Sequence, residues 1–352
     1  MVNRMFVIAL VVFAVILICF SGCGTVPTEP LISAPAQTGA PIDMQVTSAQ
    51  NDDPYRAGQT AAAALRAAMT DTPPHVVIMV ECFEGKALKH QALKGVASVF
   101  PKDTIFGFTT YGSFTQAGCL DRDAVALLGI GGNGISVAAV LKRDLGIAGL
   151  TMEDDGDVIK TRLTTAGAEL AAGLPRSDQE RLVVLMADAH SPKNQFLVEG
   201  VQAVMGKAFP ITGGSANKNA GQTFVTFRGQ MFQDSAVALM LSGDFELAMT
   251  GRQAKDNQGV ILTAGDGATE ALQNLTVKPF AMLAFNCAGR MGRLDRIEDE
   301  LTAMQQSLGK DIPLFGCYCA GEIGPADSSE QQADVLSSGV GWHVMFTALG
   351  RK

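Results

Sequence analysis

The densest group of side chains that could do chemistry lies toward the C-terminus, in two polar stretches that each follow an apolar run. They are FNCAGR at 285–290 and GCYCAGE at 316–322. Arg290 can hold a carboxylate through two parallel hydrogen bonds, and Glu322 can accept a hydrogen bond from an ammonium or hydroxyl group. If neighbouring parallel strands bring the two stretches together, they would suit a zwitterion such as an amino acid. The alternative is a structural Arg290 to Glu322 pair that closes the turn.

Two glycine-rich turns occupy matching positions earlier in the chain, TTYGS at 109–113 and ITGGSAN at 211–217. In open α/β sheets, ligands collect outside the carboxyl ends of the strands. Glycine there lets the backbone approach a ligand and offer N–H groups. We therefore expect the turns to contribute to a ligand site. The predicted ligand-binding residues are Thr110, Tyr111, Gly213, Gly214, Ser215, Cys287, Arg290, Tyr318, Gly321 and Glu322.

The motifs of nucleotide, metal and nucleic-acid sites do not fit this sequence. No turn has GxGxxG or P-loop spacing. EDDGD at 153–157 lacks EF-hand spacing and is expected to be a solvated acidic loop, and His75, His90 and His343 are isolated. The formal net charge is -8, with no visible basic stripe to neutralise phosphates. We predict no cofactor, no metal and no nucleic-acid partner.

Thiol catalysis is an alternative to simple binding. A thiol nucleophile needs a base and a group that orients the base. Cys287, Cys317 or Cys319 could be the nucleophile of a hydrolase, and the MADAH stretch could supply His190 as base and Asp188 as orienting group. The thiols of Cys317 and Cys319 are expected to point to opposite faces, which argues against a bridge between them. We expect binding without turnover, with a non-catalytic envelope scaffold as the other alternative.

The elements that must position these residues follow a repeated order. Three stretches each have a helix, a buried strand, a second helix, a proline, and another strand that ends in one of the polar turns. Aligned on Ile105, Ile211 and Pro313, the copies are offset by 106 and 102 residues. The apolar runs VVIMVEC, LVVLMAD and AMLAFN indicate strands buried on both faces, so each copy is expected to be a right-handed βαβ crossover. We predict an α/β fold of repeated α-β-α-β-β units that form mixed sheets covered by helices.

The N-terminus has the features of an export signal. Arg4 precedes an uncharged run from Met5 to Phe20, which is short for a spanning helix. Two small residues then precede Cys23, the pattern on which lipoprotein signals are acylated and cut. The following stretch is rich in Pro, Thr, Ser, Ala and Gln, without periodicity. We expect a lipoprotein signal peptide over 1–22, lipidation of Cys23 and a disordered tether over 23–53.

The motifs resemble one known family. IPLFGCYCAGEIGP at 312–325, with CAGR upstream at 287–290, is similar to the C-terminal FIST module. TIFGFTTYGSF at 104–114 and FPITGGSANKN at 209–219 resemble the N-terminal FIST module. The resemblance covers roughly 55–349 and implies sensory modules for small ligands such as amino acids, which are often attached to signalling outputs. It also implies that Cys287, Arg290, Gly321 and Glu322 match the family's motif positions.

From these observations we expect an N-terminal FIST-like module over 54–250 and a C-terminal one over 251–352. The expected function is an extracytoplasmic lipoprotein that senses or scavenges a small polar metabolite. It would be held to a membrane of the cell envelope by its lipid and would pass any signal to an unknown partner protein.

Overall fold

A computed structural model describes residues 30–218 and 221–351. The predicted signal peptide and Cys23, the predicted lipidation site, lie outside the described residues. No helix within the described ranges is long and apolar enough to cross a membrane.

Three units with the same order of main helices and strands follow one another along the chain. In the first unit the elements are β2 (Asp43–Gln50), α1 (Pro54–Ala68), β3 (Pro74–Glu81), α2 (Lys86–Ala97), η1 (Lys102–Thr104), β4 (Ile105–Thr109), β5 (Ser113–Thr115), β6 (Gly118–Leu120) and β7 (Ala124–Gly131). In the second they are β8 (Ile135–Lys142), α3 (Met152–Ala172), β9 (Glu180–Ala187), α4 (Asn194–Met205), β10 (Ile211–Ser215), β11 (Val225–Phe227), β12 (Gln230–Phe232) and β13 (Ala236–Gly243). In the third they are β14 (Phe245–Gln253), α5 (Asn257–Gln273), β15 (Pro279–Cys287), α6 (Ala288–Met291), α7 (Ile297–Leu308), β16 (Leu314–Cys319), β17 (Glu322–Gly324), β18 (Ser338–Val340) and β19 (His343–Arg351). A short strand, β1 (Leu31–Ile32), precedes them.

The sheets confirm the predicted α/β class and its mixed strand directions. The first sheet has the order β12-β11-β4-β3-β7-β2, the second β1-β8-β13-β9-β10-β17-β18, and the third β14-β19-β15-β16-β5-β6. Within the units, β3 and β4, β9 and β10, and β15 and β16 are parallel neighbours, as the crossover prediction requires. The other pairings are antiparallel.

A cyclic exchange of hairpins locks the units together. The hairpin β5-β6 of the first unit pairs with β16 of the third, β11-β12 of the second pairs with β4 of the first, and β17-β18 of the third pairs with β10 of the second. Each sheet is therefore completed by strands from another unit. The N-terminal and C-terminal modules expected from the sequence share sheets and form one interlocked body.

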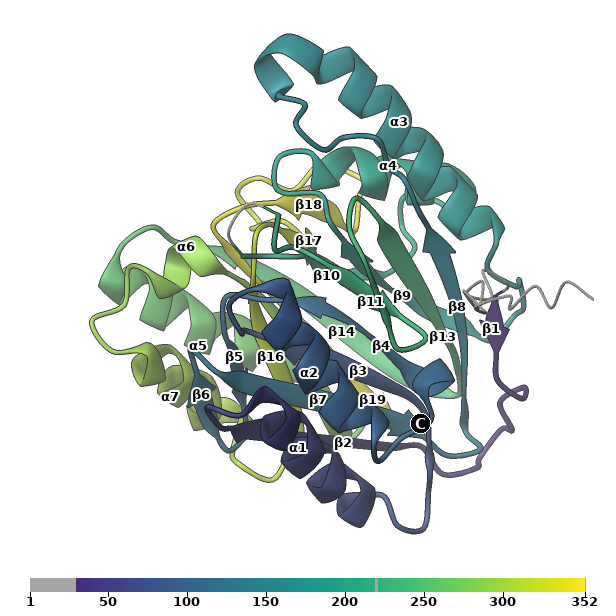
Figure 1. The fold of residues 1–352 in the computed structure, drawn as a ribbon. Coiled ribbons are helices and arrows are strands. Elements are labelled where there is room, and N and C mark those ends of the chain that lie inside the picture. Colours follow the sequence, from purple (N-terminus) through teal and green to yellow (C-terminus); the bar gives the residue numbers. More distant parts are fainter. Residues whose placement is uncertain (1–29, 219–220, 352) are drawn as a thin grey trace, which may run out of the picture.

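The sheets enclose a common core, and the helices cover their outer faces (Figure 1). The inner core takes side chains from each sheet, including Val80, Met186 and Phe285, and the Phe108 and Phe285 rings stack at a centroid distance of 6.4 Å. Separate outer cores lie under α1 and α2, under α3 and α4, and under α5 and α7. Strands buried on both faces explain the nearly continuous apolar runs.

Local sequence fixes the start of each unit's first helix. Asp53, Thr151 and Asp256 are N-cap residues whose side chains accept hydrogen bonds from backbone N–H groups in the first turns of α1, α3 and α5. The predicted acidic loop at 153–157 is wrong, because these residues form the beginning of α3. Carboxylates there are favoured by the positive end of the helix dipole.

The structure also corrects the expected tether. Residues 43–50, expected to be unstructured, form β2, an edge strand paired with β7 along its whole length. Met44 and Val46 are buried in the inner core. Their period-two spacing is a strand signal, but it lies within a mostly polar segment.

Candidate functional site

The three polar turns meet at one end of the sheets. The Asn217 N–H donates to the Thr109 carbonyl at 2.9 Å, the Tyr111 N–H to the Tyr318 carbonyl at 3.0 Å, and the Ser215 N–H to the Gly321 carbonyl at 2.8 Å. Hydrogen bonds thus link the first turn to the second and the third, and the second to the third. In the third unit, Cys287 is the register partner of Cys319 on the adjacent parallel strand. The structure brings together the segments that the sequence selected, while their role in ligand binding stays a prediction.

Arg290 does not stand open to a ligand at this end. Its guanidinium is fully buried and donates to a Glu300 carboxylate oxygen at 2.9 Å and to the Asn286 side-chain oxygen at 3.1 Å. It also donates to the Val260 carbonyl at 3.0 Å. Neither the predicted ligand clamp nor the alternative pair with Glu322 is formed, because Glu300 of α7 is the partner. The sequence held a sign of this pairing, because Glu300 is an acidic residue on the otherwise apolar face of the helix expected over 294–308.

Glu322 and Cys287 form a second buried group beside Arg290. A Glu322 carboxylate oxygen accepts from the His343 N–H at 2.9 Å, and the other has no hydrogen-bond partner among the described residues. Burial raises the pKa of Glu322 to about 8, although hydrogen bonds from the His343 N–H and the Cys287 thiol act in the opposite direction. Burial, and then the nearby Glu322 charge, raise the pKa of Cys287 to about 11.

The space between the stretches 285–290 and 316–322 of the third unit, called here the third-unit corner, is buried and is not an open hollow. Tyr318 and Glu322 are at most 1% exposed and Cys287 is 9% exposed. The Trp342 ring lies over Gly289, so that a Cβ at Gly289 would be 3.2 Å from it. Trp342 has a φ of 66°, an uncommon conformation for a bulky residue. The expected water-accessible space between the two polar stretches is closed by these groups.

The thiols of Cys317 and Cys319 correct another expectation. Their sulfur atoms are 3.7 Å apart in the inner core, on the same face of β16. Residues two apart on a strand share a face, so the expectation of opposite faces was wrong. Both cysteines are free thiols.

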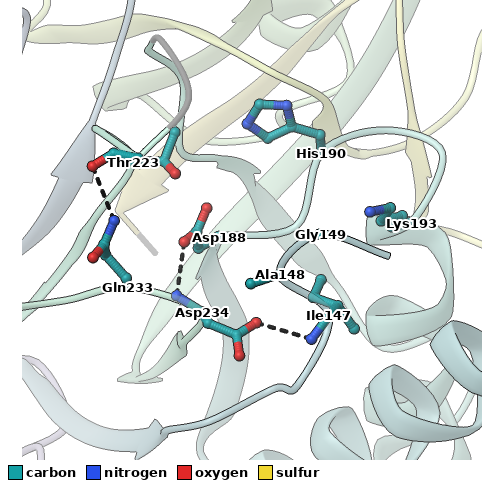
Figure 2. A pocket seen from close by; sticks show the side chains of 10 residues that line it. Ile147, Ala148, Gly149, Asp188, His190, Lys193, Thr223, Gln233 and Asp234 are labelled. Carbon is teal, nitrogen blue, oxygen red and sulfur yellow. Dashed lines mark hydrogen bonds between the residues drawn. The ribbon is translucent and has the colours of Figure 1, made fainter. Parts of the chain in front are cut away.

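The open cavity lies at the equivalent strand end of the second unit (Figure 2). It has a volume of about 360 Å³. Its walls come from the loops after β8, after β9, after β10 and before β13. The lining residues are Ile147, Ala148, Gly149, Asp188, His190, Lys193, Gly221, Thr223, Gln233 and Asp234.

The cavity combines a carboxylate, an imidazole and an ammonium group from one short loop. Figure 2 shows Asp188, His190 and Lys193 around the same hollow, where β9 gives way to α4. Asp188 accepts from the Asp234 N–H at 2.7 Å. Burial raises the pKa of Asp188, while the hydrogen bonds from Asp234 and Thr223 act in the opposite direction. The Lys193 ammonium donates to the Leu150 carbonyl at 2.6 Å.

Two anchors fix the walls of this cavity. The Asp234 carboxylate accepts from the N–H groups of Gly146 at 2.7 Å and Ile147 at 3.1 Å, which holds the loop after β8 in place. On the inner side, the Ser215 hydroxyl donates to the Ala189 carbonyl at 2.7 Å. Ser215, which the sequence selected as a ligand-binding residue, therefore supports the pocket loop from behind.

The same loop joins the pocket to the buried third-unit corner. The Ser191 N–H donates to the Ala320 carbonyl at 2.9 Å, and the Asn194 amide donates to the Glu322 carbonyl at 3.2 Å. Loop 188–194 thus has an outer face that lines the cavity and an inner face against the third polar turn.

Sequence reasoning found only part of the pocket. Asp188 and His190 were considered only as partners of a thiol nucleophile, and Lys193, Thr223 and Asp234 were missed. The available signal was the position of MADAH in the second unit, since it matches FNCAGR in the third.

Comparison with known families gives the assignment. A model described as the FIST N domain matches residues 76–264, more than half of the chain, and one described as the FIST C domain matches residues 219–325. The chain belongs to the FIST family. FIST domains are sensory or signalling domains that bind small ligands. The resemblance inferred from the sequence motifs is confirmed for both modules.

Solved structures give weaker likenesses. A cyanuric acid hydrolase has 9% identity and a TM-score of 0.45, covering 88% of this chain and 100% of its own. The cyanuric acid hydrolase of A. caulinodans has 11% identity and a TM-score of 0.45, with 89% and 100% coverage. PurLQS from Thermotoga maritima has 8% identity and a TM-score of 0.29, with 88% and 72% coverage. No curated protein matches the chain. These likenesses are too weak to carry an argument about activity.

Proposed function

We propose that this FIST protein binds a small polar ligand, carrying both an amino and an acidic group, in the cavity between Asp188, His190 and Lys193. The observation that carries the proposal is a partly buried carboxylate within a cavity whose wall also has an ammonium group and an imidazole. Asp188 would hold the ligand's amino group, and Lys193 its acidic group. An amino acid has this chemistry.

The size of the cavity supports a metabolite rather than a macromolecule. About 360 Å³ lies at the lower end of the volumes of small-molecule sites. The loop that carries Asp188 also contacts the third polar turn through Ser191 and Asn194. A ligand that pulls on Asp188 can thereby change the packing of the interlocked sheets, which is how we propose that binding is passed to a partner protein. The alternative is a scavenger, in which binding has no such consequence.

The binding proposal predicts a charge-specific effect at Asp188. Calorimetric titration of the full-length chain with individual amino acids should give at least one saturable ligand. Asp188→Asn should weaken it tenfold or more, about 1.4 kcal/mol, because the amide keeps the shape but loses the charge. Asp311→Asn, at an exposed position, is the matched control and should bind like the wild type. Absence of any small polar ligand, or equal affinity in Asp188→Asn, would refute the assignment.

We also propose that binding occurs without turnover. A thiolate is the reactive form of cysteine, and burial raises the pKa of Cys287 to about 11 and that of Cys319 well above its usual value. Cys317 and Cys319 have no exposed surface. These observations favour binding over the thiol-dependent hydrolase considered from the sequence.

We propose, finally, that the protein is lipid-anchored in the cell envelope through Cys23. The support is the sequence pattern FSGC after an apolar run. In bacteria fed radiolabelled palmitate, the wild-type chain should carry label and the Cys23→Ser variant none, whereas Cys19→Ser should be labelled like the wild type. Label that persists in Cys23→Ser would contradict the anchor.

A further inference from the structure

A cationic stripe runs along the exposed side of α2, next to the buried Lys89 of the same helix. Lys86, His90 and Lys94 lie four residues apart, so they share one face of the helix. Lys102 on η1 adds a fourth basic group near this face. The net negative composition hides this stripe, and the sequence analysis did not find it.

The stripe borders a cavity with no acidic residue in its wall. The cavity has a volume of about 680 Å³ and lies between α2, η1 and the turn that joins β11 to β12. Lys86, His90 and Lys102 supply its basic groups, and Gln230 and Met231 of β12 are among its other lining residues. The Lys86 ammonium lies 5.6 Å from the centroid of the Phe224 ring.

No carboxylate of the described chain forms an ion pair with these basic groups. The ion pairs within residues 30–218 and 221–351 involve neither Lys86, Lys94 nor Lys102. By contrast, Lys89 on the same helix is buried against Glu81, with its ammonium 3.2 Å from the carboxylate. Among the described residues, the positive charges of Lys86, Lys94 and Lys102 are thus not neutralised by an ion pair.

The pKa of His90 reflects the positive charges that surround it. Its pKa is lowered, first by partial burial and then by Lys94, Lys102 and Lys86. The charges come from both elements that face the imidazole, α2 and η1. An anion placed among them would relieve their repulsion and favour the protonated imidazole.

We propose that this cavity is a second ligand site, which takes a small multivalent anion with a dianionic phosphate group. The ammonium groups of Lys86 and Lys102 and the imidazole of His90 line one concave surface and are donors of the kind that such a group requires. The phosphate group would belong either to a free phosphorylated metabolite or to a lipid headgroup. The site is separate from the Asp188 cavity and does not depend on its function.

The test uses the full-length chain in a nonionic detergent at fixed ionic strength. Inorganic pyrophosphate represents free phosphate, and dioctanoyl phosphatidic acid represents a lipid headgroup. We expect saturable binding of at least one probe, with at least tenfold weaker binding in Lys86→Ala/Lys102→Ala. The control is Lys207→Ala/Lys310→Ala, which removes the same charge at two exposed positions and should bind like the wild type.

A second measurement separates a site from general charge attraction. Bound probe should raise the pKa of His90, followed by its NMR signals, by more than sodium chloride of equal ionic strength does, because salt only screens the lysine charges. Binding of pyrophosphate alone identifies a free anion as the ligand, and binding of phosphatidic acid alone identifies a headgroup. The proposal is overturned if neither probe binds, or if both double variants lose binding equally.

Discussion

Replacing Arg290 with alanine is expected to lower the free energy of unfolding by about 3–5 kcal/mol, measured by urea denaturation. The change removes the partner of Glu300, whose carboxylate is fully buried and would remain without a compensating charge. It also removes the donors to the Asn286 side-chain oxygen and the Val260 carbonyl. A buried polar group that loses its partner keeps its full desolvation cost.

Two controls separate the loss of this buried pair from the loss of an arginine. Arg296→Ala breaks an exposed pair with Asp299, with a nitrogen to oxygen distance of 3.8 Å, and should change stability by less than about 1 kcal/mol. The double variant Arg290→Met/Glu300→Leu should recover only part of the loss: neither charge is then buried alone, but the Asn286 amide and the Tyr318 hydroxyl lose Glu300 as their acceptor. If Arg290→Ala unfolds like the wild type, the buried pair with Glu300 does not stabilise the fold.

The repeated units could be predicted because their signals are local. Short apolar runs before amphipathic helices, each followed by a glycine-rich turn, appear three times at similar spacing, and the parallel pairs β3 with β4, β9 with β10, and β15 with β16 follow from them. Side-chain period and turn residues carry this information within a dozen residues. The three polar turns could be expected at one end of the sheets, because each of them follows a strand of such a parallel pair.

The hairpin exchange could not be predicted, because it is a long-range pairing without a local signature. The hairpin β5-β6 lies close in sequence to β4 but pairs with β16, about two hundred residues away. Edge strands such as β2 were missed for another reason. In β2 only Met44 and Val46 are buried, and Ser48 at the next position on that face ends the alternation, so the strand signal is too short to stand out.

At the strand ends, sequence reasoning selected the third unit, where Arg290 and Glu322 are buried, whereas the cavity beside Asp188 lies in the second unit. Arg290 and Glu322 looked available because charged side chains are rarely fully buried. Burial became possible because Glu300 on α7 and the His343 N–H supply their partners. In the second unit the equivalent strand end carries Asp188, whose carboxylate borders the cavity. Which of the three equivalent strand ends has an open cavity depends on how the loops pack, and this cannot be predicted from the residue types alone.

The helix pairs that cover the sheets provide the second large effect. Gly167 of α3 and Gly200 of α4 face each other, and a Cβ at Gly200 would lie 2.1 Å from the Thr164 carbonyl oxygen. The crossing in the first unit has the same form, since a Cβ at Gly58 would lie 2.1 Å from the Ala92 carbonyl oxygen. In the third unit the corresponding contact is looser, and a Cβ at Gly265 would meet Ala303 atoms at 3.3 Å and beyond.

Gly200→Ala is therefore expected to destabilise the protein by about 3 kcal/mol, the upper part of the range for overpacked cores. The obstacle is a backbone carbonyl, which cannot rotate away as a side chain does, so α3 and α4 must separate and loosen the core beneath them. Gly265→Ala is the matched control. Its gain in helix propensity, about 1 kcal/mol, opposes a mild contact, so the net change should stay below that value. Urea denaturation of both variants decides the matter, and equal stability of the two would show that the helix pairs do not depend on glycine for their close approach.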